Sequence, residues 1–444
     1  MYLRFLGLLL LAALLTALVR ALRPSRYGLV FGLLLLYIPV MERLPLNLAP
    51  GVSLLTIFLV VLFSLRAAGG TPPSGARSTA FRGLLYAWLA VSGFGFLMGV
   101  SGAMPLLDLA VLFKRWLDPI LASLLALRIT RAEDRKFMLA CALIGYALVG
   151  VQGVREGLDI GSKVRIVGLI GQANELGAFL AMYAPLALVA ALFLTTGLVR
   201  YALFGCLVFG AWALLFTQSR AALLALPVGV LTVLFVCGRG GMGLVGVLLV
   251  ALMWAFPEFL PENATARFET IYVEDGPGTA EQLEPSAAAR IEIWKGTLSM
   301  ASAHPLGVGF AQFHYVIPQY AQIDKKYATD AHNFYLLIWG EFGLAGLLVL
   351  LALIWRLLAN VWTVASQAAD EFLRALGQGI CATMLATLVV NFFGSRLMDI
   401  QVSTYLWVLS ATLARACDTL RDTKSAPAAV VVSRLRENAW GLGR

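Results

Sequence analysis

Long apolar runs recur along nearly the whole chain, and this feature constrains the fold more than any other. A helix of about 20 apolar residues crosses the core of a bilayer, where every backbone polar group must be bonded within its own segment. Only 13% of the residues are charged, whereas about 25% is usual in a soluble domain. The apolar segments lie near 3–20, 27–41, 51–66, 81–100, 105–128, 136–152, 166–195, 199–216, 220–237, 241–257, 333–355, 374–393 and 397–416. The sequence therefore predicts an all-α polytopic membrane protein with about 12–13 transmembrane helices, and the short run at 27–41 leaves the N-terminal count open.

One long polar stretch interrupts this pattern. Residues 258–331 carry ten acidic and five basic side chains, a net charge of −5, and the rest of the chain carries +14. We therefore expect one polytopic domain over residues 1–417, with 258–331 as a large loop inside it, and a basic tail at 418–444. A nucleic-acid-binding protein needs a basic surface domain, which this distribution does not supply.

The basic residues lie mostly in short connections, and these predict the topology because cytoplasmic connections are rich in Lys and Arg. Base-poor connections at 101–104, around Thr217 and at 258–331 alternate with basic ones. The basic connections are at 20–26, 66–82, 128–136, Arg200, Arg239, 356–374 and the tail from Arg415. We expect the large loop outside and the tail in the cytoplasm. The side of the N-terminus depends on whether two or three spans precede residue 70.

A helix is expected inside the large loop. Residues 287–303 follow Ser286, an N-cap residue, and precede His304-Pro305, which stops a helix. Trp294, Leu298 and Ala301 would form one apolar stripe, and Arg290 shares that face because it lies four residues before Trp294. Such an arginine either extends its charged end to water or binds a lipid phosphate.

His332 is the strongest candidate for chemistry. It lies where the large loop meets the next apolar segment, and Asp330 could cap the helix that starts there, leaving His332 in the first turn. A histidine pKa near 6.5 suits a general base at neutral pH. His304 and His314 lack this context.

Two other features of the His332 segment have structural interpretations. Glu341 lies nine residues further, on the opposite helix face and about 13 Å along the axis, so it cannot pair with His332 as acid and base. We expect a structural or gating role for it. Gly340, Gly343 and Gly346 predict a small-residue face for close helix packing.

Four arginines are expected on the same side of the membrane as His332. They are Arg165, Arg220, Arg290 and Arg396. Asn174 and Glu175 follow Arg165, two to three turns inside a span by this interpretation. Since arginine binds phosphate oxygens bidentately and keeps its charge, arginines beside a base favour stabilisation of a diphosphate leaving group.

Metal chemistry is not expected from the sequence. The five cysteines are in or beside separate apolar runs with no Cys-x-x-Cys spacing, and neither His-Glu-x-x-His nor Asp-x-Asp occurs. We therefore expect no metal and no cofactor. A transporter would place polar groups near mid-bilayer in both halves, whereas here they gather at one outer face, which favours an enzyme.

The His332 segment resembles the bacterial O-antigen ligase / O-antigen polymerase family. The family's ligase motif is His, then Asn, Ser or Gln, nine residues, then Gly-x-x-Gly, which His332, Asn333, Gly343 and Gly346 match. Further similar stretches, within a match over about 165–350, are Thr217-Gln218-Ser219-Arg220, Arg290-Ile-Glu-Ile-Trp, His304-Pro-Leu-Gly-Val-Gly-Phe310 and Gly171-Gln-Ala-Asn174.

The resemblance implies a metal-independent inverting glycosyltransferase with a GT-C-like fold and short amphipathic helices in one large periplasmic loop. It would work at the periplasmic face of the bacterial inner membrane on an undecaprenyl-diphosphate-linked glycan. The acceptor is left open between lipid A-core, a growing glycan and a protein hydroxyl. His332, Arg220 and Arg290 would be catalytic, and Arg165, Arg396, Asn333 and Asn174 would bind substrate.

Overall fold

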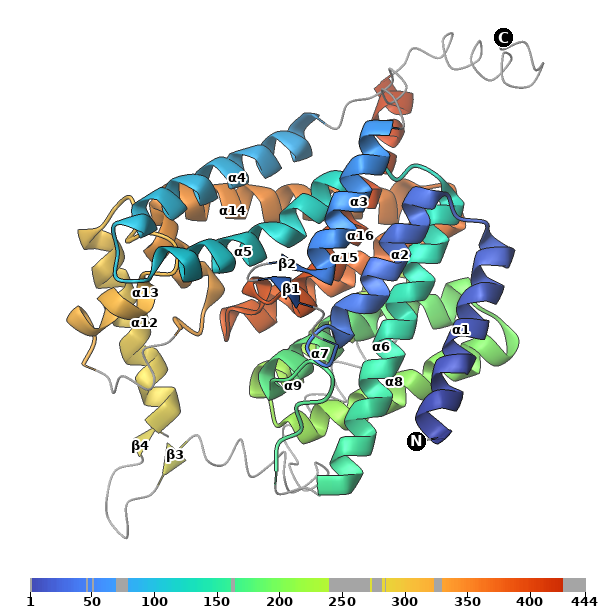
Figure 1. Cartoon of the computed structure of the whole chain (residues 1–444), viewed down its shortest axis with the longest axis horizontal. Coiled ribbons are helices and arrows are strands. Elements are labelled where there is room, and N and C mark those ends of the chain that lie inside the picture. Colours follow the sequence, from blue (N-terminus) through green and yellow to red (C-terminus); the bar gives the residue numbers. More distant parts are fainter. Residues whose placement is uncertain are drawn as a thin grey trace.

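A computed structural model gives the arrangement of most of the chain (Figure 1). It describes residues 2–44, 47–49, 52–68, 79–160, 164–238, 272–273, 282–283, 285–322 and 330–425. The expected segment 241–257 lies outside the described residues, as does the tail from residue 426.

The described chain is almost entirely helical, as the sequence predicts. The helices of the first half are α1 (Tyr2–Leu22), α2 (Arg26–Tyr37), η1 (Ile38–Val40), α3 (Leu54–Ala68), α4 (Thr79–Val100), α5 (Leu106–Ala126), α6 (Ala132–Ile160), α7 (Ala173–Val189) with its continuation η2 (Ala190–Leu194), α8 (Gly197–Thr217) and α9 (Arg220–Val236). Those of the second half are α12 (Pro285–Ala303), α13 (Phe313–Val316), η4 (Ile317–Gln319), α14 (Phe334–Gln367), α15 (Glu371–Phe392), η6 (Arg396–Met398) and α16 (Ile400–Ser425). Two antiparallel strand pairs complete the described elements, β1 (Asn47–Ala49) with β2 (Val52–Ser53) and β3 (Tyr272–Val273) with β4 (Gln282–Leu283).

Six helices in the described part of the chain are long and apolar enough to cross a membrane. They are 80–100, 132–159, 173–194, 197–217, 334–367 and 371–392, and four shorter apolar helices accompany them. Helix α5 also forms where an apolar segment was expected, but it carries Asp108, Lys114, Arg115 and Asp118. The all-α polytopic class is confirmed, whereas the full count of 12–13 spans stays a prediction.

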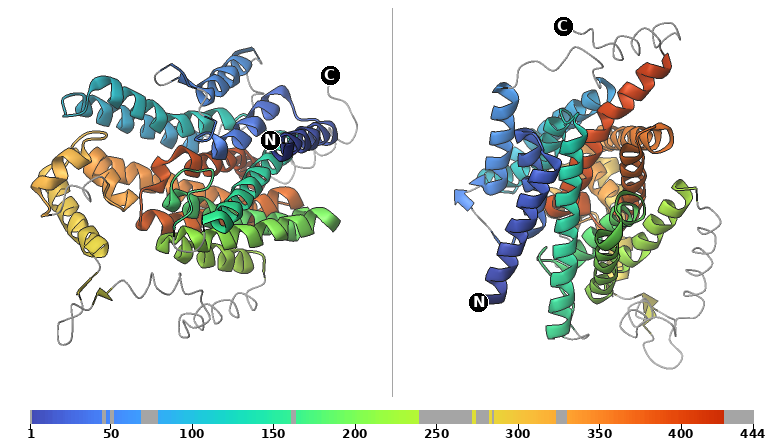
Figure 2. Two further views of the ribbon diagram at one scale, coloured as in Figure 1. Left: turned by 60° about the horizontal axis from the view of Figure 1, so that its bottom comes forward. Right: turned by 90° about the vertical axis from the view of Figure 1, so that its right-hand side faces the viewer.

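The centre of the bundle consists of α7, α15 and α16. Helix α7 packs between α8, α9 and α15, and α16 packs against α5 and α14 (Figures 1 and 2). The other helices surround this centre: α2 and α8 contact α6, α4 lies along α14, and α12 packs on α14 at one end of the molecule.

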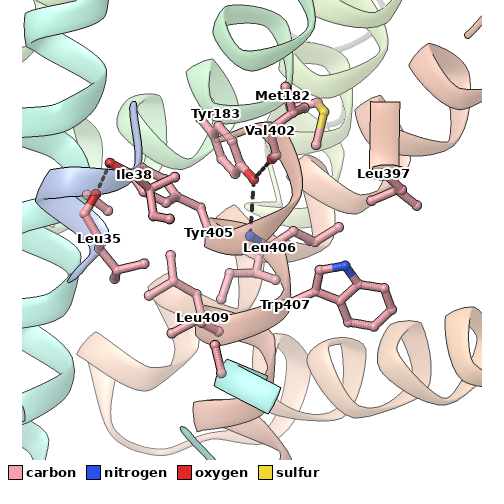
Figure 3. Packing of buried hydrophobic residues seen from close by; sticks show 14 of the residues in the cluster. Leu35, Ile38, Met182, Tyr183, Leu397, Val402, Tyr405, Leu406, Trp407 and Leu409 are labelled. Carbon is pink, nitrogen blue, oxygen red and sulfur yellow. Dashed lines mark hydrogen bonds between the residues drawn. The ribbon is translucent and has the colours of Figure 1, made fainter. Parts of the chain in front are cut away.

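Tyrosine hydroxyls fix the start of α16 in this centre (Figure 3). Tyr183 of α7 donates to the Val402 carbonyl and accepts from the Leu406 amide, and Tyr405 donates to the Leu35 carbonyl at 2.7 Å. All of these groups are buried, where an unpaired polar atom is costly. The bonds therefore hold α16 in register against α2 and α7, and they set the position of the residues that precede it.

The connections gather at two ends of the bundle. At one end, here called the basic end, Asp134 accepts from the Ser25 amide at 2.7 Å, and Arg128 donates to the Arg66 carbonyl at 3.4 Å. At the other, the His332 end, Arg43 donates to the Gly168 carbonyl at 2.7 Å. The same end holds the base-poor connection 101–104, where the Ala103 amide donates to Gln312 at 2.9 Å.

One expected helix boundary differs from the structure. Helix α7 begins at Ala173 and not at residue 166, because Gly168 and Gly171 adopt φ values of +58° and +91° and Gln172 is extended. Positive φ is available to glycine but interrupts a helix. Asn174 is therefore in the first turn of α7, which corrects the expectation that it lies two to three turns inside the span.

Candidate functional site

Helix α14 is broken at Gly343, and a loop from the large polar stretch fills the break. Gly343 has φ +69° and ψ −172°. The amides of Val308 and Gly309 donate to the carbonyls of Gly340 and Glu341 at 2.9 and 3.0 Å. A Cβ on Gly343 would lie 2.5 Å from the Pro305 carbonyl oxygen. The first glycine of the Gly-x-x-Gly motif, Gly343, is thus a helix break against which the 305–309 loop packs. The expectation of a simple helix-packing face is wrong for Gly343.

Glu341 stabilises this junction. Its side chain is 3% exposed, and its Oε1 accepts from the Phe313 amide at 3.4 Å. Within the described residues its Oε2 has no hydrogen-bond partner. The carboxyl group therefore ties α13 to α14, which agrees with the expected structural role.

His332 lies just before α14, and Asn333 is the N-cap of that helix. The Asn333 Oδ1 accepts from the amides of Tyr335 and Leu336 at 3.0 and 3.1 Å. His332 itself has φ +50°, an uncommon conformation for a residue with a side chain. The expectation that Asp330 caps the helix with His332 in its first turn is therefore wrong. Asn333 is extended and adjacent to the first helical residue, so its side chain reaches the open amides first.

Asp330 faces His332 instead. Its Oδ2 lies 3.7 Å from His332 Nδ1, and its Oδ1 accepts from Ser395 Oγ at 2.7 Å. Burial lowers the pKa of His332 below its usual 6.5, the Asp330 carboxylate raises it in part, and the guanidinium groups of Arg290 and Arg396 lower it again. The neutral form of the His332 imidazole is thus favoured, with the Asp330 carboxylate near its Nδ1 and the guanidinium groups of Arg290 and Arg396 within electrostatic range.

Arg396 is held by acidic and amide side chains. Its NH1 lies 3.2 Å from Asp399, 3.7 Å from Glu175 and 3.0 Å from the Gln172 Oε1. Partial burial raises the pKa of Asp399 to about 6, while Arg396 pulls it down. Arg396 therefore joins the start of α7 to the α15–α16 connection beside His332.

Arg165 and Asn174 hold the turn that carries Arg220. Arg165 donates to Asn174 Oδ1 at 2.6 Å and to the Thr217 carbonyl at 2.8 Å. Gln218 has φ +51°, and α9 begins directly afterwards at Arg220. The half-buried Arg220 is thus the first residue of α9, directly after this α8–α9 turn.

Arg290 lies on α12, which forms close to its expected bounds. The buried face of this helix runs through Ala289, Ile293, Thr297, Met300 and Ala301. Leu298 is 44% exposed, so the expected stripe through Leu298 is wrong. Trp294 Nε1 donates to the Ala331 carbonyl at 3.0 Å. This bond ties α12 to the loop of His332. Half-buried Arg290 lies one turn before Trp294, and its guanidinium group lowers the pKa of His332.

The other two histidines have partners of their own. His304 Nε2 lies 3.0 Å from the Tyr320 hydroxyl, directly after the end of α12. The His314 ring centroid lies 3.8 Å from that of Tyr315. Among the described residues no group of three or more His, Cys, Asp or Glu side chains could hold a metal ion.

Several members of the cluster were not expected from the sequence. Ser395, Asp399 and the Asp330–His332 contact come together only in three dimensions. The one local signal was the spacing of Arg396 and Asp399, three residues apart in a short connection, which allows an ion pair.

The fold defines a multi-pass helical membrane protein with a cluster of titratable side chains around His332 at one end of its bundle. Comparison with known families then gives a more specific assignment. Residues 205–351 match the model of the O-antigen ligase family, and this range contains Arg220, Arg290, His332 and the α14 break. This match supports membership of the O-antigen ligase / O-antigen polymerase family over residues 205–351, in agreement with the resemblance of the His332 motif. None of the curated proteins compared with the chain matches it.

The O-antigen ligase family implies a glycosyltransferase-type enzyme of surface polysaccharide biosynthesis, and the match supports that coarse class for the matched range. The family range ends soon after Gly346, so it covers the segment on which His332, Asn333 and the helix break are placed.

Proposed function

We propose that the protein is a metal-independent, inverting glycosyltransferase with a GT-C-like fold. In this proposal it transfers a glycan from undecaprenyl diphosphate to an acceptor hydroxyl, at the periplasmic face of the bacterial inner membrane. The observation that carries the proposal is His332 beside Asp330, within the electrostatic influence of Arg290 and Arg396.

His332 acts as the base. With Nδ1 turned towards Asp330, its Nε2 is the nitrogen available to the acceptor. It takes the hydroxyl proton while the acceptor oxygen bonds to the anomeric carbon and the bond from that carbon to the diphosphate oxygen breaks. The electron pair leaves with the diphosphate. Asp330 orients the ring and stabilises the imidazolium that forms, as carboxylates do in other base–carboxylate pairs.

Arg220 and Arg290 stabilise the diphosphate as it leaves. A guanidinium binds phosphate oxygens bidentately and does not lose its proton, so it can neutralise charge without a metal ion. Arg165 and Asn174 support Arg220 through the α8–α9 turn. Arg396 adds positive charge beside His332 while its own bonds hold the cluster together. Asn333 contributes by capping α14 and thereby setting the position of His332.

The product formed by the purified protein from a lipid-diphosphate glycan tests this function. Glycan moved to lipid A-core supports ligation, which we favour. A longer glycan on the same lipid indicates a polymerase, and glycan on a protein hydroxyl indicates protein glycosylation. Activity that survives a strong chelator supports the metal-independent mechanism, and loss of activity restored by added metal contradicts it. If the protein moved the intact lipid-linked glycan across the membrane and transferred no glycan, it would be a transporter and not an enzyme.

A further inference from the structure

A cavity of about 360 Å³ lies beside the His332 cluster, and no step described above uses it. Its volume is near the lower end of the range for small-molecule sites, about 300–1,000 Å³. The polar side of the cavity is made by Glu42, Arg115, Glu175, Asp399 and Gln401. The cavity therefore has the size of a small ligand and a wall rich in hydrogen-bonding groups.

The groups of the polar wall are paired with one another, and they range from buried Gln401 to the exposed side chains of Glu42 and Arg115. Gln401 is 4% exposed and its amide nitrogen donates to Glu42 Oε1 at 3.0 Å. The same carboxylate oxygen lies 3.6 Å from the Arg115 guanidinium. On the other side Arg396 holds Glu175 and Asp399. Carboxylates accept, guanidinium groups donate and an amide does both, so this wall can bond several hydroxyl groups at fixed positions.

The opposite wall is apolar and aromatic. Trp116 and Phe310 line the cavity and are 7% and 2% exposed. Trp116 Nε1 donates to Ser92 Oγ at 3.0 Å, which satisfies its only donor within the protein. A sugar ring combines hydroxyl groups at its rim with apolar C–H faces. The cavity matches both properties.

The charge of the cavity disfavours an anion. Three carboxylates line it, and Arg115 is the one cation among its described lining residues. Arg396 touches two of these carboxylates from outside the lining. An added negative group would compete with Glu42 for Arg115 and with Glu175 and Asp399 for Arg396, and it would lie close to like charges, which is unfavourable. A diphosphate or a uronic acid is therefore a poor ligand here.

The cavity lies on the acceptor side of the proposed reaction. Arg396 forms an ion pair with Asp399 in the cavity wall, and it also lowers the pKa of His332. In an inverting displacement the acceptor hydroxyl approaches the anomeric carbon from the face opposite the leaving group. The diphosphate is expected at Arg220 and Arg290 and is disfavoured in this cavity. The cavity is therefore assigned to the acceptor.

We propose that this cavity is the acceptor subsite, and that it takes a sugar ring without negative charge, a hydroxyl of which reaches His332. This inference rests on the proposed function and makes it more specific, because it favours a glycan end over a protein hydroxyl as acceptor. Glu42 and Gln401 bond to each other, and in this proposal they determine specificity and are not catalytic.

Two matched photoreactive probes test the proposal on the full-length protein in nanodiscs. One is a methyl glucoside bearing a diazirine, and the other is the corresponding glucuronide, which differs only by a carboxylate in place of the hydroxymethyl group. We expect the glucoside to label peptides that contain Glu42 or residues 398–401, and the glucuronide to label them about tenfold less. This comparison uses the wild-type protein, so it does not depend on how a variant folds.

Glu42→Gln is expected to raise the ratio of glucuronide to glucoside labelling several-fold, because it removes one of the carboxylates that disfavour an anion. Glu292→Gln is the matched control, since Glu292 has similar exposure (48% against 46%) but lies on α12 outside the cavity. It should change neither probe. Bare undecaprenyl diphosphate, added as competitor, should leave the cavity labelling unchanged.

Equal labelling by both probes, labelling away from the cavity, or protection by undecaprenyl diphosphate would overturn the acceptor assignment. Failure of the proposed function has a different signature. In that case the purified protein transfers no glycan from any lipid-diphosphate donor, while the contrast between glucoside and glucuronide labelling persists.

Discussion

Arg135 at the basic end and Arg396 at the His332 end of the bundle are paired differently. Buried Arg135 donates to the carbonyls of Thr130, Ile129 and Thr412 at 2.9, 3.2 and 3.3 Å. Arg396 faces Asp399 and Glu175. Backbone carbonyls keep their charge state, whereas carboxylates and imidazoles can exchange protons. Arg135 is therefore a fixed structural support of its end, whereas Arg396 lies among groups that can take part in proton transfer.

The largest expected effect is that of His332→Ala. Loss of a general base typically reduces a rate about 10²–10⁴-fold, and no second base lies within the described cluster at a comparable position, so we expect transfer to become undetectable. The amount of protein in the membrane should not change. The measurement is glycan transfer by purified variants in equal amounts, with His314→Ala as the control. Transfer at the wild-type rate by His332→Ala would remove His332 from the mechanism.

Arginine substitutions at the two ends sharpen the comparison. Arg290→Ala should lower the transfer rate about 10²–10³-fold, because it removes one charged contact to the leaving group, and it should leave expression unchanged. Arg135→Ala should act in the opposite manner. It leaves buried carbonyl groups without their donor, so the yield of folded protein falls, while the specific activity of the remaining molecules stays near the wild-type value. Equal losses of yield for both variants would contradict the division between the two ends.

Asp330→Asn is expected to reduce the transfer rate by about tenfold and to move its pH dependence. The Asp330 carboxylate raises the pKa of His332, so its removal lowers that pKa. Since the neutral imidazole is the base, the wild-type rate should fall as the pH drops through the pKa of His332, which lies below the ordinary histidine value, and the acid limb of the variant should lie at still lower pH. A profile of kcat/KM between pH 5 and 8 measures this shift. An acid limb displaced to higher pH would mean that another group controls it.

The sequence predicts the helical class and the grouping of residues but not their contacts. Apolar length alone indicates membrane helices, and base-poor connections indicate which residues share an end. His332 was found because a histidine at a loop–helix junction is unusual in an apolar chain. The Asp330–Ser395 bond depends on how α15 meets the loop before α14, and a pattern along one segment does not contain that information.

The wrong expectations for the start of α7 and for Gly343 have the same physical cause. Residues 166–172 are apolar enough for a helix, yet their backbone amides are bonded by Glu156 from α6, which accepts from Val167 and Gly168 at 2.9 Å. Gly343 has the spacing of a packing face, and its positive φ becomes apparent only with the 305–309 loop in place. Both cases are decided by a partner that is remote in sequence and that supplies hydrogen bonds in place of the helix.

Substitution of Asn333 has the smallest expected effect. It tests whether this residue caps α14 or binds substrate. Asn333→Ala removes the acceptor for two amides at the start of α14, which should cost about 1 kcal/mol of stability. Asn333→Ser keeps an oxygen that can cap, so it should melt close to the wild type and is the matched control. Thermal melting of the purified variants measures this difference, and transfer should fall only a few-fold in Asn333→Ala because His332 loses positional order but not its chemistry. If Asn333→Ala instead lost donor binding at an unchanged melting temperature, Asn333 would be a substrate ligand, and the cap would be incidental to its presence beside His332.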